Sequence, residues 1–319
     1  MKVALLLERR REQWHELESL CRLMERRGPR PLGGAKVSRF ASLYRGACAD
    51  LALADAYQLP LDTVEYLHQL VGRAHNQLYR SQTFRWRQWG RTMFVELPRK
   101  LVRDRALWLA FAIFWGIFAL SLYLAYTSRE YADKAIGQAA MESYRENFSR
   151  PIRGRPGGMD SAMTGFYVQH NAGIGLRCFA GGLLFGIGGL FTVVFNAMQL
   201  GATFGYMLTL EERVNFLQFV TAHGPFELTA IVFSAGAGMR LGFSLVTTGG
   251  LSRAASLRQA AIEASPMMGA AVILFCLAAM IEGFISPSAL PYAVKAGVAV
   301  LSTVILAFYV IGLGLLRRD

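Results

Sequence analysis

The chain has 319 residues and a net charge of +12, with 53% hydrophobic and 18% charged residues. An average soluble domain carries about 25% charged residues, so this composition argues against a wholly soluble protein. The charged residues concentrate in residues 1–105, whereas residues 106–319 contain long runs with almost no charge. We therefore predict an all-α protein in which an N-terminal cytoplasmic helical bundle precedes a polytopic α-helical membrane domain.

Three helices are expected in the N-terminal domain, over residues 8–27, from about residue 38 to residue 59, and over 61–82. Apolar residues recur every three or four positions in the first and third of these segments. No alternating pattern typical of a strand occurs. The segments predict a small bundle with one modest core.

Metal binding is not expected in this domain. His68 and His75 are seven residues apart, which is not the usual spacing of a metal-binding pair, and capping of the bundle or pairing with Asp50 or Asp55 fits better. The four cysteines (21, 48, 178 and 276) have no CxxC spacing, which argues against a zinc site or a disulfide framework.

Residues 84–105 are predicted to form a basic, aromatic-rich helix along the cytoplasmic membrane surface, directly before the first span. Its basic patch consists of Arg85, Arg87, Arg91, Arg99, Lys100, Arg103 and Arg105. A basic stripe also occurs in nucleic-acid-binding proteins. Next to a span, however, the positive-inside rule explains it more simply, and we expect membrane lipids rather than nucleic acid as the partner.

About six spans with both termini in the cytoplasm are predicted. The expected spans are 107–126, 174–192, 193–210, 227–248, 267–285 and 292–316. Residues 128–171 are expected to be an extracytoplasmic segment, with a short helix at about 133–147 followed by an extended loop. Residues 252–265 are predicted to be an amphipathic cytoplasmic connector. A re-entrant path within 172–222 is the alternative to two spans there.

Ionisable residues within apolar segments are costly, so they are candidates for function. His223 and Glu227 are four residues apart and share a helix face, and Glu282 comes from another span. The two residues could simply start a helix, or the three could form a substrate contact, a proton relay or a metal site. Because the HExxH motif is absent and no third strong ligand is evident, we predict no metal and no cofactor.

Arg240 is predicted to pair with a carboxylate or with backbone carbonyls, and Glu263 and Glu282 are the candidate partners. Asn196 and Gln199, in the middle of an apolar block, complete the set of substrate or proton candidates. The small residues at 235–238 and the glycine-rich run 181–189 predict close helix packing, or a helix break in the second case.

No catalytic motif is recognisable. A phosphate-binding loop, a dinucleotide fingerprint and a Ser-His-Asp elbow are all missing from the sequence. We therefore predict that the chain is not an enzyme.

Several stretches resemble one bacterial family along nearly the whole chain. They are LLERRREQWHELESL, LYRGACADLALA, LVGRAHNQLYR, FNAMQLGATFGYM, HGPFELTAIVFSAGAGMRLG and IEGFISP. Together they resemble the stage II sporulation protein M family, in its form outside spore formers. The Asn-Gly that is usual in that family appears here as Asn196-Ala197.

The resemblance implies a bacterial inner-membrane protein that organises a complex. Sporulation members of the family resemble scaffold components of a cell-wall remodelling complex. Members like this chain are associated with an AAA-type ATPase of the MoxR kind and with von Willebrand A-domain proteins. We accordingly expect a non-enzymatic scaffold that forms a homodimer. The alternatives are a transporter or lipid-handling protein with a cavity around His223, Glu227, Arg240 and Glu282, and, less favoured, an intramembrane hydrolase.

Overall fold

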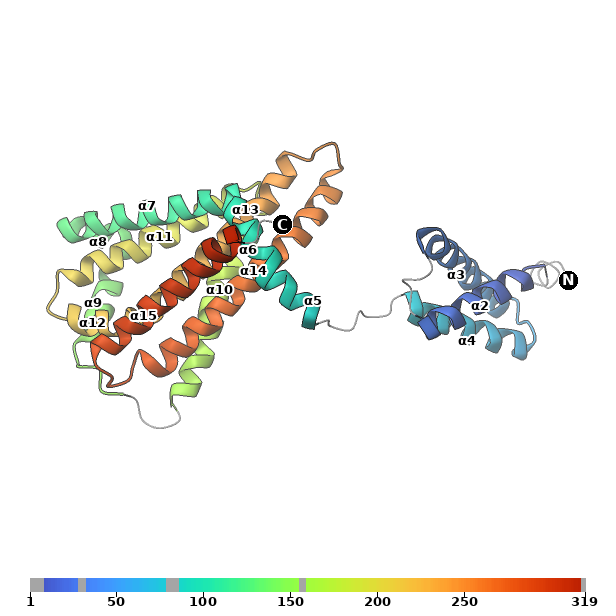
Figure 1. The fold of residues 1–319 in the computed structure, drawn as a ribbon, viewed down its shortest axis with the longest axis horizontal. Helices are drawn as coiled ribbons and strands as arrows, with labels where there is room; N and C mark the ends of the chain where they lie inside the picture. The colour runs from blue at the N-terminus through green and yellow to red at the C-terminus, as the bar shows by residue number, and fades with distance from the viewer. Residues whose placement is uncertain (1–8, 28–32, 79–85, 155–158, 317–319) are drawn as a thin grey trace. The chain divides into compact units, whose positions relative to one another are not determined.

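The computed structural model describes residues 9–27, 33–78, 86–154 and 159–316. Across these residues the protein is helical and contains no strand, which confirms the predicted all-α class. The chain divides into two compact units, Met1–Arg85 and Trp86–Asp319 (Figure 1). The basic juxtamembrane segment therefore packs with the membrane unit.

The N-terminal unit is a bundle of three helices, α2 (Arg11–Arg27), α3 (Gly33–Ala56) and α4 (Leu61–Leu78). Each helix contributes apolar side chains to one core, and among them Leu17 and Phe40 are fully buried. The apolar spacing in the sequence predicted this core, because residues three and four apart share a helix face.

Polar contacts fasten the bundle around Asp50. This buried carboxylate accepts a hydrogen bond of 2.9 Å from the Trp14 indole and pairs with Arg10. The two histidines have separate partners: His68 lies 3.7 Å from Asp55, one of the expected carboxylates, and His75 shares a hydrogen bond with Tyr44.

Cys21 is fully buried in this core, and burial raises its thiol pKa to about 11. A shift of two units above the ordinary value lowers the thiolate fraction at neutral pH about 100-fold. We expect a maleimide at pH 7.5 to modify Cys21 only when the bundle unfolds, whereas the partly exposed Cys48 reacts in the native state. Peptide mass spectrometry with and without urea measures this difference. Equal native labelling of both thiols would contradict the buried position.

The predicted juxtamembrane helix is divided into three parts, α5 (Trp86–Arg91), a π-helical segment η2 (Thr92–Glu96) and α6 (Leu97–Arg103). It ends at Asp104, whose backbone is extended and whose side chain caps α7 (Arg105–Thr127) by accepting from the Leu107 N–H. A carboxylate at this position satisfies one of the free N–H groups at a helix start. This cap separates the juxtamembrane segment from the first apolar helix.

Within the described residues, five helices are long and apolar enough to cross a membrane. They are Arg105–Thr127, Ile187–Leu208 (α11), Gly224–Val246 (α13), Arg253–Ile285 (α14, Arg253–Met280, with η3, Ile281–Ile285) and Tyr292–Leu315, which begins with α15 (Tyr292–Ala307). These helices confirm a polytopic membrane protein. The predicted span at 107–126 and the spans beginning near 227 and 292 lie close to observed helices.

The path through residues 128–210 differs from the prediction. Helices α8 (Arg129–Ile136) and α9 (Gln138–Phe148) replace the single short helix, and α10 (Met159–Gly181) occupies much of the expected extended loop. The helix break falls at residues 182–186 rather than at 192/193. Phe185 and Gly186 at the end of this turn have positive φ values of 53° and 81°, and Gly186 directly precedes α11.

The expected connector at 252–265 is also different, because it is the first part of α14 and continues into the next apolar segment through Pro266. A proline inside a helix leaves one carbonyl without its helical donor. Packing against neighbouring helices allows membrane proteins to tolerate this.

Glycines bring the membrane helices into close contact. On α11, a Cβ added to Gly201 or Gly205 would collide with the backbone carbonyls of Phe118 and Leu122 on α7. In Figure 1 these two helices run side by side. Such small-residue spacing allows backbones to approach in a bilayer, where apolar burial alone does not drive helix association.

Helix α13 lies at the centre of the membrane unit. In its most apolar window 67% of the residues are buried, compared with 11% for the Tyr292–Leu315 helix. The small residues at 235–238 are all buried, as expected from their composition, and Gly236 packs against Leu107 of α7. This central position places both ends of α13 among polar groups from other helices.

Candidate functional site: two polar clusters on α13

The polar candidates lie at the two ends of α13. His223 directly precedes the helix and Glu227 is in its first turn, whereas Arg240 lies thirteen residues after Glu227. At 1.5 Å per residue this separation is about 20 Å. The residues between them from Ala230 to Met239 are buried. The four predicted residues therefore do not surround one cavity.

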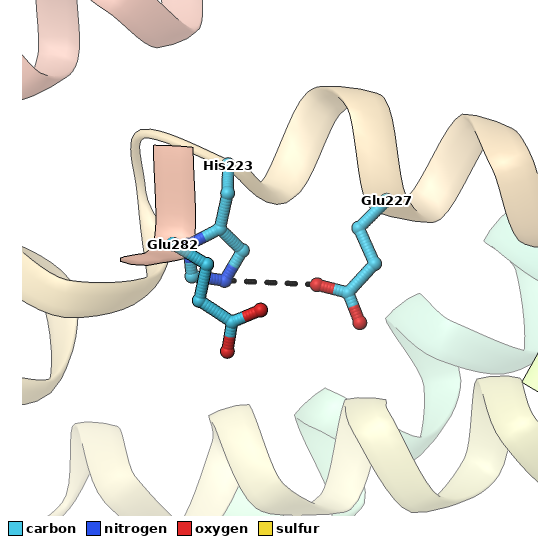
Figure 2. A group of neighbouring side chains, drawn as sticks. All are labelled: His223, Glu227 and Glu282. Carbon is cyan, nitrogen blue, oxygen red and sulfur yellow. Dashed lines mark ion pairs between the residues drawn. The ribbon is translucent and has the colours of Figure 1, made fainter. Parts of the chain in front are cut away.

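The first cluster contains His223, Glu227 and Glu282, and Figure 2 shows the three side chains converging. The Nε2 atom of His223 lies 3.6 Å from Glu227 Oε2, and one ligand atom from each residue lies within 4.8 Å of the others. His223 is only 5% exposed. Glu282 is contributed by the π-helical segment η3, a local geometry that is often found at functional sites.

Neighbouring residues hold this cluster in place. His223 Nδ1 shares a 2.8 Å hydrogen bond with the Ser286 hydroxyl, and the Asn171 amide on α10 donates to Glu282 at 3.5 Å. Ser286 is itself fixed, because the buried Lys295 ammonium donates to its carbonyl at 2.7 Å and to that of Ser288 at 2.8 Å. Sequence reasoning did not identify these supporting residues, although a lysine within the last apolar run is a visible signal.

The second cluster surrounds Arg240. Its guanidinium donates to Asp104 at 2.8 Å and to Glu263 at 2.9 Å. The predicted partner Glu263 is confirmed, whereas Glu282 belongs to the first cluster. Asp104 was missed because it stands within the basic patch, where a single carboxylate attracts little notice. Arg240 thus joins the start of α7, α13 and α14.

Residues 106–287 match the family model described as stage II sporulation protein M. The chain belongs to the stage II sporulation protein M family. Residues 4–80 match a second model, described as a domain of unknown function (DUF8413). No curated protein and no solved structure gives a significant match.

The region that places the chain in the stage II sporulation protein M family contains the whole first cluster and Arg240, but it begins after Asp104 and ends before Lys295.

Asn196 and Gln199 also lie in the region matched by the family model, outside both clusters. The Asn196 amide donates to the Thr192 carbonyl at 2.7 Å and to Cys178 Sγ at 3.7 Å, and the Gln199 carbonyl accepts from Thr203. Their contacts within and between helices favour a packing role.

An open cavity of about 810 Å³ lies beside the Arg240 cluster. Its basic lining residues are Arg99, Lys100, Arg103, Arg105 and Arg240. Asp104 and Glu263 are the acidic residues in the lining, so basic groups are in excess. The remaining members of the predicted patch lie elsewhere: Arg87 and Arg91 are on α5, and Arg85 is outside the described residues.

Proposed function

We propose that this integral membrane protein is a scaffold that organises a complex at the cell envelope. The observation that supports this most directly is the division of the chain into a helical bundle with its own core and a separate membrane unit. Such a bundle can bind a partner while the membrane unit anchors the assembly. The two separate polar clusters also favour a packed anchor over a single substrate channel.

The proposed partners are an AAA-type ATPase of the MoxR kind and von Willebrand A-domain proteins, which the family resemblance implies. Deleting residues 1–85 should leave the membrane unit inserted but remove these partners from the affinity-purified complex. Quantitative mass spectrometry of complexes from native membranes measures this. The Glu227→Gln variant is the matched control and should retain the partners. Undiminished partner recovery after the deletion would refute docking through the bundle.

We further propose an inner-membrane location with both termini in the cytoplasm and a homodimeric assembly. If α10 crosses the membrane together with the five apolar helices, the number of crossings is even, and the basic segment before α7 favours the cytoplasmic side. Reporter fusions after residue 150 and after the C-terminus should report opposite sides. Mass measurement in nanodiscs tests the dimer.

Transport or lipid handling is the second candidate, and the His223–Glu227–Glu282 cluster is the observation in its favour. A proton-coupled carrier would need an ionisable group at this position. In that case Glu227→Gln should abolish substrate uptake into vesicles that contain the protein. If Glu227→Gln still bound the partners and the wild-type protein showed no substrate uptake, the scaffold function would be favoured.

The basic cavity is expected to attract anionic lipid headgroups. A basic residue near an anionic surface contributes about 1 kcal/mol, so replacing Arg99, Lys100 and Arg103 together with Gln should strongly reduce the retention of phosphatidylglycerol. Native mass spectrometry of the protein measures the retained lipid. Arg129→Gln on α8 is the control, because this exposed residue is not among those lining the cavity. Equal lipid retention by the triple variant would contradict the expectation.

A further inference from the structure

In contrast to the prediction of no metal from the sequence, we propose that His223, Glu227 and Glu282 bind one first-row divalent cation, for which Zn²⁺ is the first probe. One imidazole and two carboxylates form a donor set that suits Zn²⁺, Mn²⁺ or Fe²⁺. The three residues come from the start of α13 and from η3, so the site joins two segments that are far apart in the sequence. The proposed metal site is independent of the scaffold function proposed above.

The distances fit an ion better than direct contact between the side chains. His223 Nε2 and Glu227 Oε2 are 3.6 Å apart, which is longer than an ordinary hydrogen bond of about 2.7–3.2 Å. Two ligands of a tetrahedral Zn²⁺, each about 2.0–2.1 Å from the metal, lie roughly 3.3 Å apart. The ligand atoms of all three residues lie within 4.8 Å of one another, so small side-chain rotations complete the coordination.

The surrounding contacts orient the ligands as the outer contacts of metal sites do. A metal-binding histidine usually donates its second ring N–H to a fixed acceptor, and ligating carboxylates are hydrogen-bonded as well. Here His223 Nδ1 bonds to the buried Ser286 hydroxyl, which leaves Nε2 directed towards Glu227. The Asn171 amide donates to Glu282. The imidazole and one carboxylate are therefore held in position before any ion binds.

Electrostatics also favours a cation. Two carboxylates beside an imidazole concentrate negative charge in a largely buried place when they are ionised, and burying charge is costly. The buried Lys295 ammonium donates to the carbonyls of Ser286 and Ser288. A divalent ion would balance the carboxylates. Three protein ligands would leave one coordination position open for water or for an external ligand.

The test uses the full chain in nanodiscs, dialysed against a Zn²⁺ buffer and measured by inductively coupled plasma mass spectrometry. We expect one zinc per chain in the wild-type protein and at least a tenfold loss of affinity in His223→Asn, Glu227→Gln and Glu282→Gln. Co²⁺ replaces Zn²⁺ in a parallel sample, where visible absorption bands typical of four-coordinate Co²⁺ are expected and should be lost in the variants. The absence of stoichiometric Zn²⁺ and Co²⁺ binding by the wild-type protein would overturn the proposal.

Two controls separate this site from other causes of metal binding or loss. Glu263→Gln removes a carboxylate from the Arg240 cluster, and His68→Gln removes an exposed histidine from the N-terminal bundle. Both should keep one zinc per chain. Asn171→Ala, which retains all three ligands, should bind zinc more weakly without losing the Co²⁺ spectrum. Zinc retained by all three ligand variants, or lost equally from His68→Gln, would place binding elsewhere and overturn the assignment.

Discussion

Gly242→Ala is expected to destabilise the membrane unit by at least about 3 kcal/mol, at the upper end of the usual range for overpacking or beyond it. A Cβ at Gly242 would collide with the backbone N of Gly186 and the carbonyl oxygen of Gly182. Backbone atoms in a tight turn cannot rotate aside as a side chain can. The added methyl group should therefore separate α13 from the turn between α10 and α11.

Thermal unfolding of the protein in nanodiscs, followed by circular dichroism, measures the effect. The matched control is Gly116→Ala on α7, where an added Cβ has no neighbouring atom within 4 Å. Because alanine favours a helix over glycine by about 0.5–1 kcal/mol, this control should be neutral or slightly stabilising. Similar melting temperatures for the two variants would show that the turn does not pack closely against α13.

Arg240→Ala is expected to lower stability by about 3 kcal/mol, the lower end for breaking a buried ion pair. The Arg240 side chain is 26% exposed, but its partner Asp104 is only 5% exposed and would lose its countercharge. Asp104 also caps α7, so the disturbance should reach the start of that helix. Arg240→Lys should restore only part of the loss, since one ammonium does not reproduce the two-sided geometry of a guanidinium.

Glu263→Gln separates the two halves of this interaction. Glu263 is 41% exposed, and exposed pairs contribute about 0–1 kcal/mol, so this variant should unfold close to the wild-type temperature. Hydrogen exchange at the first turn of α7 adds a local measurement, with faster exchange expected only in the Arg240 variants. If Glu263→Gln were as destabilising as Arg240→Ala, Asp104 would not be the principal partner.

The sequence was sufficient for the helical class and for most of the apolar helices, since an apolar run of about 20 residues is a strong signal by itself. It was weaker where a helix is kept in place by its neighbours. Helix α10 contains Asp160 and Arg177, and the sequence predicts a loop over part of its length. The glycine-rich run 181–189 predicted close packing or a helix break, but the exact position of the turn at 182–186, which packs closely against α13, was not predicted.

The candidate site was predictable only in part. The four-residue spacing placed His223 beside Glu227, and the expectation of a partner for Arg240 included Glu263. Asp104 could not be found in this way, because it lies 136 residues from Arg240 in the chain and only the fold brings them together. The supporting contacts of Ser286 likewise depend on how η3 turns towards α15.

The central position of α13 has a consequence for how the protein is made. This helix has a mean hydropathy of 1.4, compared with 2.4 for Tyr292–Leu315, and it carries Arg240, whose residue type disfavours membrane insertion by a few kcal/mol at a helix centre. Asp104 is synthesised before α13, whereas Glu263 follows it. The translocation machinery therefore receives a weakly apolar helix whose charge already has one partner at the start of α7. We therefore expect insertion of α13 to be favoured when α7 remains beside it during synthesis.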